Sequence, residues 1–442
     1  MPSAFLKHPF MSQQALSECN DEAMVRAMLA FELALAEVQE ASGAVPQGAS
    51  QQMRAQLEHV TFDTAAIAEG IASGGNAAIP FVKQGRSLLP DELKRYWHQG
   101  ATSQDVIDSA LMLLLTPRLR ALNDLLVRCR EASLTLMDAH IATPMVGRTL
   151  MQQALPITFG VKVAHWAIGL EQSRRRLAAI ELPVQFGGAV GVHSGWDAQG
   201  LEWMDALAKR LGLATSVLPW HTDRYPIHSL GTALDAIAGA AEKVAQDVAL
   251  LTQTEVGEVA EPSAPGMGES SSMPHKRNPV RSALIRGAAR QVHGHTSVLL
   301  NAAAQPLERG LGEWHAEWAP LMESALLVEG ALEQMAVLLE GLEVYPDNME
   351  RNLAATGGGI MAEPVARLLA PHLGAEDAKA LSAQAAEISR RDKRPYADVL
   401  ADHAKVKDQI DPITLRKTCD PALYLGSSQQ QVLRAKRWLI NA

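Results

Sequence analysis

Apolar residues recur at helical spacing through much of the chain. In Asp21–Leu33 they lie three and four positions apart, which predicts an amphipathic helix with Asp21 as its N-terminal cap. Five longer segments keep this period: 105–137, 149–180, 228–255, 278–304 and 318–342. At 1.5 Å per residue, each would extend on the order of 40 Å, which predicts a bundle of long helices.

Prolines and helix length suggest how the chain is divided. Pro117 lies inside the first long segment, where it is expected to kink or divide the helix. From Tyr345 onward the periodic segments shorten and prolines become frequent, which predicts a small C-terminal domain. The expected fold is all-α with three domains: an N-terminal helical domain over 1–110, a central long-helix bundle over 111–344, and a C-terminal helical domain over 345–442. Long helices with apolar residues on more than one face favour an oligomer.

Composition narrows the class of protein. The 442 residues are 47% hydrophobic but only 5% aromatic, which favours helices over sheets. The 49 Asp and Glu outnumber the 40 Lys and Arg, so broad nucleic-acid binding is not expected. Three scattered cysteines and the lack of a signal-peptide pattern predict a cytoplasmic protein without disulfides. The longest uncharged run, 291–307, is too short and too polar for a membrane span.

The densest group of chemically active residues is Ser270–Pro279, which reads SSSMPHKRNP. It follows a stretch rich in Gly and Pro over 257–268 and precedes a predicted helix. Three hydroxyls and two cations on such a loop suit an anion, provided that the glycines let the loop move. For such a loop in general, the alternative is an ordinary helix-capping segment with solvated Lys and Arg.

The string SSxMPxKxNP resembles the signature of the fumarase/aspartase superfamily. Residues 96–109, YWHQGATSQDVIDS, and 147–158, GRTLMQQALPIT, are similar to its first and second motif regions and occur in the expected order. The likeness continues to 352–359 and so covers nearly the whole chain. One difference is Glu269, which stands where the family usually has a glycine before the first serine.

This resemblance implies a reaction and a site. Members make or break a C–O or C–N bond beta to a carboxylate without metal or organic cofactor, as homotetramers whose sites combine three subunits. The aci-carboxylate intermediate needs fixed cations and hydrogen-bond donors. By resemblance these are Lys276 and Asn278, with Ser270 as the acid or base at carbon and Ser271 as the alternative. The expected substrate-binding residues are His98, Thr102, Ser103, Arg148, Thr149, Gln152, His221, Ser271 and Arg277.

Three further features are weaker site candidates. His98 and His221 are polar wall residues or hydrogen-bonded structural residues, and neither has another ligand at metal-binding spacing, so no metal site is expected. The glycine-rich segment 187–191 favours close backbone packing over phosphate binding. Segment 308–317, which contains Glu308, Arg309, His315 and Glu317, corresponds to a family segment near the site, but no catalytic role is predicted for it.

Two departures from the family pattern point to the chemistry. Leu150 replaces the histidine that acts as general acid in typical members, and Ala283 replaces its partner carboxylate. Losing a general acid slows departure of an amine or hydroxide by roughly 10²–10⁴-fold. A carboxylate, with a pKa of about 4, needs no such help. The cycloisomerase branch of the family, in which a carboxylate of 3-carboxy-cis,cis-muconate closes a lactone within one molecule, fits this loss, although its usual residue at position 150 is Trp.

The expected function is therefore the lactonisation of a small tricarboxylate in the degradation of aromatic acids by the β-ketoadipate pathway. Segments 218–224 and 420–426 also resemble that branch. One alternative is a fumarate-releasing lyase that acts on adenylosuccinate or argininosuccinate. Leu150 and Ala283 argue against this alternative. Another is a non-catalytic structural relative, against which the retained Ser270 and Lys276 weigh.

Overall fold

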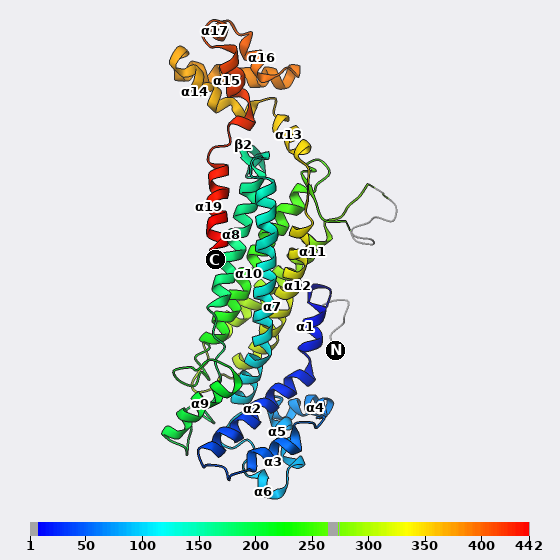
Figure 1. Cartoon of the computed structure of the whole chain (residues 1–442), viewed down its shortest axis with the longest axis vertical. Coiled ribbons are helices and arrows are strands. Elements are labelled where there is room, and N and C mark those ends of the chain that lie inside the picture. The colour runs from blue at the N-terminus through cyan, green and yellow to red at the C-terminus, as the bar shows by residue number, and fades with distance from the viewer. Residues whose placement is uncertain (1–7, 264–272, 274, 442) are drawn as a thin grey trace. The chain divides into compact units, whose positions relative to one another are not determined.

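Helices make up most of the protein. The computed structural model describes residues 8–263, 273 and 275–441 (Figure 1). The first part of the chain forms η1 (His8–Phe10), α1 (Gln13–Glu18), α2 (Asp21–Ala41), α3 (Ala49–Leu57), α4 (Thr64–Gly74), α5 (Ala78–Leu88) and α6 (Asp91–Lys94). Helix α2 begins after Asn20, whose side chain accepts a hydrogen bond from the Ala23 amide. Asn20 is thus the cap, and Asp21, predicted as the cap, lies in the first turn.

The long helical segments predicted from the sequence are present. They are α7 (Ser103–Ala139), α8 (Phe159–Ala178), α10 (Tyr225–Leu251), α11 (Val280–Ala302) and α12 (Glu313–Glu340), with the shorter α9 (Ala198–Leu211) between α8 and α10. The all-α fold class is confirmed. Pro117 does not divide its helix, because α7 continues through it for 37 residues. Helix α12 likewise contains Pro320.

Contact density divides the chain into two compact units. The first comprises Met1–Leu125, Ser173–Glu242 and Leu284–Glu333, and the second comprises Leu126–Gln172, Lys243–Ala283 and Gln334–Ala442. The division falls inside each of the five long helices. These units are defined by contact density alone, so they do not test the three domains predicted from the sequence. The three domains stay a prediction.

The first unit has an aromatic cluster beside its N-terminal helices. The Phe81 ring lies 5.2 Å from that of Phe62 and 6.1 Å from that of Trp97, measured between centroids. Trp97 is 1% exposed and donates its indole N–H to the carbonyl of Val82. Gly85 allows this packing, because a Cβ there would lie 2.6 Å from the Trp97 ring. The cluster holds the chain immediately before His98.

The second unit contains a β-hairpin that the helical period does not predict. Strands β1 (Pro144–Thr149) and β2 (Gln152–Thr158) pair antiparallel, although the sequence pattern predicts a helix from about Thr149. Pro156 lacks an amide proton and disfavours a helix, but a two-stranded ribbon tolerates it at an edge. The helix expected over 149–180 is therefore shorter and begins at Phe159. The second short ribbon pairs β3 (Val259–Ala260) with β4 (Glu343–Val344).

Short helices complete the second unit. They are α13 (Pro346–Ala354), η2 (Gly359–Met361), α14 (Ala362–Leu373), α15 (Ala375–Asp392), α16 (Tyr396–Ala401), α17 (Ala404–Lys407), α18 (Pro412–Cys419), η3 (Pro421–Leu423) and α19 (Ser428–Ile440). Helices α14 and α15 pack together (Figure 1). Fully buried Val365 and Leu369 of α14 and Leu400 of α16 belong to one hydrophobic core. The shorter helices predicted after Tyr345 are present.

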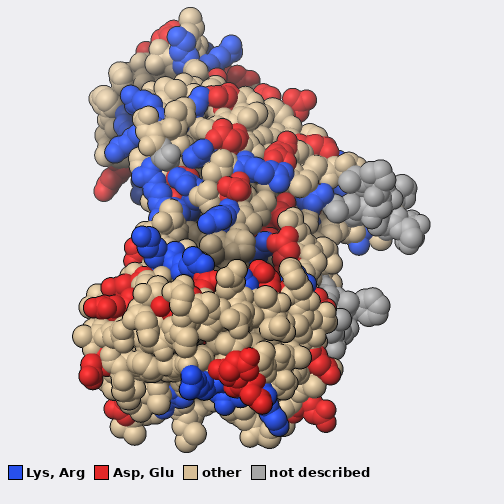
Figure 2. Space-filling view, turned by 60° about the horizontal axis from the view of Figure 1, so that its bottom comes forward, with Lys and Arg blue, Asp and Glu red and all other residues tan. Residues whose placement is uncertain are grey.

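The molecular surface carries both signs of charge. On the face in Figure 2, basic and acidic side chains lie close to one another. None of the described helices combines the length and apolar character that a membrane crossing needs.

The turn of the β1–β2 hairpin is strained. Leu150 and Met151 form its two-residue loop with φ of +49° and +64°, so both adopt the left-handed conformation. Glycine and asparagine are the usual residues in such a turn, because a larger side chain costs roughly 1–2 kcal/mol there. The two side chains are 97% and 69% exposed, so packing within the chain does not offset this cost.

Replacing this turn with Leu150→Asn and Met151→Gly should raise the free energy of unfolding by about 1–2 kcal/mol, because the new residues adopt positive φ without strain. Thermal and urea unfolding measure the effect. The matched control, Leu150→Ala with Met151→Ala, removes the same apolar surface and keeps the strain, so it should show no such gain. A lower stability of the Asn-Gly variant would contradict the prediction and indicate that the native side chains make contacts in the assembled protein.

Candidate active site

The buried carboxylate of Asp105 is the centre of a hydrogen-bond cluster in the first unit. Asp105 lies in the first turn of α7 and has no exposed surface. Five donors reach its two oxygens at 2.9–3.0 Å: the backbone amides of Thr102, Gly187 and Gly188, Nε2 of Gln185 and Nε2 of His221. The Thr102 contact is one half of a capping box, in which a carboxylate at the third helical position accepts from the cap amide.

The hydrogen bonds to Asp105 explain why segment 187–191 is rich in glycine. Gly187 and Gly188 bring their amides to Asp105, and Gly188 has a φ of +72°. A Cβ at Gly188 would lie 3.0 Å from the carbonyl oxygen of Gly100. The segment therefore serves close backbone packing, as its sequence suggests, and the anion it binds is a carboxylate of the same chain.

The expected carboxylate-binding pair Thr102 and Ser103 lies at the N-terminus of α7. Nη2 of Arg309 donates to the Thr102 hydroxyl at 3.1 Å and to the carbonyl of Ala189 at 3.0 Å. Among the described residues, the buried Nε of Arg309 has no hydrogen-bond partner. A helix N-terminus with a neighbouring guanidinium favours an anion. Arg309, which the sequence places in a family segment near the site without a catalytic role, is thus a strong candidate for substrate binding.

His98 lies beside a buried carboxylate in the same unit. Its Nδ1 is 2.5 Å from Oε1 of Glu32, whose side chain is 1% exposed. Burial by itself lowers the pKa of His98, but the adjacent Glu32 carboxylate outweighs this, and the pKa is raised. The backbone of His98 has a φ of +61°, and strain of this kind clusters at functional sites. His98 is therefore set up to carry a positive charge.

His221 also contacts a carboxylate, through Nε2 and Asp105 at 3.0 Å. The residue is 4% exposed, and its Nδ1 has no partner in the described part of the chain. The carbonyl of His221 accepts a hydrogen bond from Nε2 of Gln104 at 2.8 Å. Both the backbone and the ring are thus held by α7.

A buried ion triad includes residues that follow Asp105 and His221 closely in the sequence. Arg224 donates to Asp108 at 2.7 Å and to Glu317 at 2.7 Å, and all three side chains are at most 1% exposed. Burial raises the pKa of Glu317 although Arg224 opposes the shift. Glu317, one of the residues in the 308–317 segment, is therefore a structural partner of Arg224.

In the second unit, Arg148 is engaged by a carboxylate. Its two terminal nitrogens donate to the two oxygens of Glu258 at 2.9 and 2.7 Å, and Asn352 donates to Glu258 at 2.8 Å. Glu258 has no exposed surface. This bidentate pair gives Arg148 a structural role beside the substrate-binding role predicted from the sequence. Thr149 and Gln152 face solvent at the hairpin turn.

The signature segment is only partly described. Ser270 and Ser271 lie outside the described residues, as does Glu269. Arg277 donates to Glu343 at 2.6 and 3.0 Å and to the carbonyl of Glu261 at 2.9 Å. Lys276 is exposed, and no side-chain hydrogen bond is seen for it within the described ranges. Asn278 lies two residues before α11.

Glu261 connects this segment to α11. Its carboxylate accepts from the amides of Arg281 and Ser282 at 2.9 and 2.8 Å, and from the Ser282 hydroxyl at 2.6 Å. The carboxylate thereby caps the helix N-terminus, where negative charge is favourable. No local sequence pattern signals this role, because Glu261 is 19 residues before the helix that it caps.

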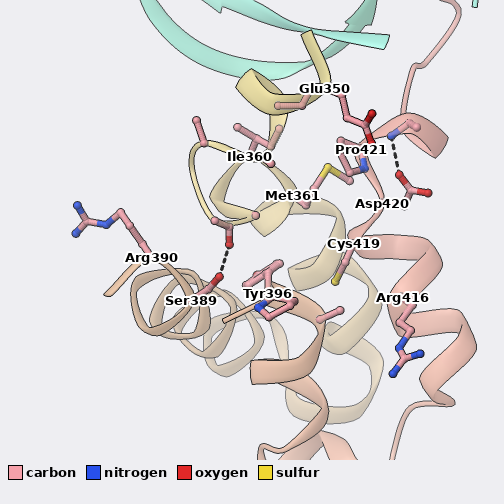
Figure 3. Close-up of a pocket in the computed structure, with 18 of the residues that line it drawn as sticks. Glu350, Ile360, Met361, Ser389, Arg390, Tyr396, Arg416, Cys419, Asp420 and Pro421 are labelled. Atoms are coloured by element: carbon pink, nitrogen blue, oxygen red, sulfur yellow. Dashed lines mark hydrogen bonds between the residues drawn. The ribbon is translucent and has the colours of Figure 1, made fainter. Parts of the chain in front are cut away.

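A separate cleft of about 1100 Å³ lies among the C-terminal helices of the second unit (Figure 3). Ile360, Met361 and Tyr396 contribute apolar surface, and Arg390 and Arg416 contribute positive charge. The Ser389 hydroxyl donates to the carbonyl of Gly357 at 2.6 Å, one of the bonds drawn in Figure 3. None of the predicted substrate-binding residues that the structure describes lines this cleft.

Comparison with known proteins places the chain in a family. Residues 8–294 match the model of the lyase family. The chain belongs to the lyase family. It is 41% identical over 432 residues to the 3-carboxy-cis,cis-muconate cycloisomerase of Pseudomonas aeruginosa, covering 96% of this chain and 94% of that protein. It is 39% identical to the nitrosuccinate lyase of Streptomyces davaonensis, covering 94% and 90% of the two chains.

A solved structure agrees with this assignment. The 3-carboxy-cis,cis-muconate lactonizing enzyme from Pseudomonas putida superposes on this lyase with a TM-score of 0.93 and 38% identity, covering 99% of each chain. The resemblance to the fumarase/aspartase superfamily found in the sequence motifs is thereby confirmed. Over residues 8–263, 273 and 275–441, no three His, Cys, Asp or Glu side chains are grouped so that they would hold a metal ion.

The Arg148–Glu258 pair predicts a measurable stability effect in this lyase. Arg148→Met should lower the free energy of unfolding by about 3–5 kcal/mol, because it leaves the Glu258 carboxylate buried without its cation. Thermal or urea unfolding monitored by circular dichroism tests this.

The matched control is Arg148→Met combined with Glu258→Gln, which removes the buried charge and keeps an acceptor for Asn352. This double variant should recover much of the lost stability. If Arg148→Met instead keeps full stability and only weakens substrate binding, the structural role of the pair is refuted.

Proposed function

We propose that this lyase is a cofactor-independent cycloisomerase that converts 3-carboxy-cis,cis-muconate to a carboxymuconolactone. The observation that carries the proposal is Leu150, an exposed aliphatic side chain at the family's general-acid position, together with Ala283 at the position of its partner. A reaction whose nucleophile is an ionised carboxylate needs neither group. The cycloisomerase relatives, 38–41% identical, support this choice.

In the proposed reaction, an oxygen of one substrate carboxylate bonds to a carbon of the conjugated diene. The π electrons of that double bond move onto the neighbouring carbon and its carboxylate, which becomes a dianionic aci-carboxylate. Lys276 and Asn278 stabilise this charge. The hydroxyl of Ser270 then gives a proton to carbon and regains one from solvent, which restores the carboxylate and leaves the lactone dianion, equal to the trianionic substrate plus one proton.

Binding of the other carboxylates is assigned to donors described above. Thr102 and Ser103 at the N-terminus of α7, with Arg309 beside them, suit one carboxylate. The partners of Arg309 are a hydroxyl and a carbonyl, so no carboxylate among the described residues neutralises its positive charge. We further propose that the protein acts in the cytoplasm as a homotetramer whose sites combine residues from several copies.

A second candidate is elimination of a weakly basic leaving group. Nitrosuccinate lyase, a relative with 39% identity, bears a name that implies loss of such a group. An anion of that kind departs without a proton donor, so Leu150 and Ala283 suit this reaction too. The two candidates differ in substrate, and a direct assay separates them.

Incubation of the purified protein with 3-carboxy-cis,cis-muconate should cause loss of the ultraviolet absorbance of the conjugated diene. Nitrosuccinate, adenylosuccinate and argininosuccinate are assayed in parallel for release of fumarate, which nitrosuccinate would release together with nitrite. The expected result is turnover of the muconate only. Turnover of any of the other three with an unchanged muconate would refute the cycloisomerase proposal.

Two serine variants serve as a matched pair in the same assay. Ser270→Ala should lower kcat by roughly 10²–10⁴-fold, the usual contribution of a general acid, whereas Ser271→Ala should have a much smaller effect. Circular dichroism checks that both variants fold. The reverse order would assign proton transfer to Ser271.

Arg309→Gln should raise KM about 10–100-fold, because a charge-assisted hydrogen bond contributes about 1.5–3 kcal/mol. Steady-state kinetics measure KM, and thermal unfolding checks stability. Arg290→Gln is the control, since Arg290 is an exposed cation on α11 that pairs with Glu242. Equal KM values for the two variants would argue against a role for Arg309 in binding.

A further inference from the structure

A groove along α8 and α19 of the second unit contains a cation that the described chain leaves unpaired. Lys162, near the start of α8, is only partly exposed, and its ammonium group makes no hydrogen bond or ion pair with any described residue. Burial lowers the pKa of Lys162. Desolvation disfavours a charge that has no partner, so an anion bound at this position would offset that cost.

The charged groups around Lys162 leave one positive charge in excess. The two carboxylates that act on it are those of Asp247 and Glu258, and each is already paired with another cation. Lys243 lies 2.5 Å from Asp247, and Arg148 contacts both oxygens of Glu258. With Lys162 protonated, three cations face two carboxylates, so a single monovalent anion balances the cluster.

Two adjoining hollows give a ligand access to this cation. Lys162, Lys243 and Asp247 line a hollow of about 430 Å³ among α8, α10 and α19. A second hollow of about 640 Å³ continues along α8 and α19, which lie side by side in Figure 1. The two adjoin because both are lined by Val161 and Gln431. None of the predicted substrate-binding residues that the structure describes lines either hollow.

The second hollow offers apolar surface for the body of such a ligand. Ala164 and Ile168 of α8 line it, together with Ala435 and Trp438 of α19. An indole ring packs favourably against another aromatic ring. Arg434 also lines this hollow, but it is exposed to solvent, so an ion pair there would contribute little.

The spacing along α19 sets the length of the ligand. Gln431 borders the hollow that contains Lys162, and Trp438 lies two turns further along the helix, which corresponds to about 10 Å. We propose that the groove binds an elongated aromatic carboxylate, with its carboxylate at Lys162 and its ring at Trp438. This site goes beyond the proposed reaction and does not depend on it.

The probe for the test is 4-phenylbutyrate, in which three methylene groups separate the carboxylate from the ring. Ligand-observed NMR titration of the intact protein gives its dissociation constant. Butyrate lacks the ring and 4-phenylbutanol lacks the charge, so each should bind at least about 10-fold more weakly than 4-phenylbutyrate. Equal binding of 4-phenylbutanol, or no binding of 4-phenylbutyrate up to about 10 mM, would overturn the proposal.

Two cation variants locate the carboxylate. Lys162→Met removes the charge and keeps an unbranched apolar side chain, so it should weaken binding of 4-phenylbutyrate about 10–100-fold. Its binding of 4-phenylbutanol should stay at the native value, which a variant with a collapsed groove would not show. Arg434→Gln is the matched control and should change binding of 4-phenylbutyrate by less than about fivefold. A larger effect of Arg434→Gln than of Lys162→Met would refute the assignment to Lys162.

A third variant locates the ring. Ala435→Phe fills the second hollow from α19, so it should weaken binding of both 4-phenylbutyrate and 4-phenylbutanol while the thermal midpoint stays the same. Native affinity of this variant for both probes would overturn the placement of the ring.

The candidate active site is a competing location for the same probe. If 4-phenylbutyrate bound there, Arg309→Gln would weaken its binding and Lys162→Met would not, and this pattern would refute the proposal. The titration involves no turnover, so the groove is tested even if 3-carboxy-cis,cis-muconate is not converted. Conversion of the muconate with no binding of 4-phenylbutyrate would support the proposed reaction and refute the groove site.

Discussion

The candidate site depends on the burial of one carboxylate, that of Asp105. Removing a carboxylate from water costs several kcal/mol unless donors replace its hydration. Here five donors do so, and they come from the start of α7, residues 185–188 and the residues before α10. Each of these segments must be correctly placed for the carboxylate to be satisfied. The positions of Thr102 and His221 thus follow from the electrostatic requirement of a residue that is itself inaccessible to substrate.

The second unit uses buried carboxylates in the same way. Glu258 holds Arg148 and Asn352, and Glu261 caps α11 next to the signature segment. A cation that neutralises a buried carboxylate contributes little net charge to a ligand. Arg148 and Arg277 are therefore weaker candidates for substrate binding than their motifs suggest, whereas Lys276 and Arg309 have no carboxylate partner among the described side chains.

The features that depend on local pattern or on motif are predictable from the sequence. The helical period locates all five long helices, because a long amphipathic segment leaves few alternatives. The same period misleads at 149–158, where Pro156 and the Leu150–Met151 turn produce a hairpin. The Thr-x-x-Asp capping box is a short sequence pattern that predicts the role of Asp105 at the start of a helix. The family motifs do not identify this role. Glu261 has no such pattern, because its partners are distant in sequence and are brought close only by the fold. Arg309 lies in the family segment 308–317, but its bond to Thr102 is set by the fold.

The family's site residues that this chain retains have a different chemical role from those that it lacks. In the proposed reaction the kept groups, Lys276, Asn278 and the donors near Thr102, stabilise negative charge. The lost groups at positions 150 and 283 would manage the proton of a leaving group. A reaction with an ionised carboxylate as nucleophile has no such proton to manage, but it still develops charge on a second carboxylate. The electrostatics of lactonisation therefore require the cations and permit the absence of the acid pair. The net charge of −9 is compatible with this because only a few local cations are needed.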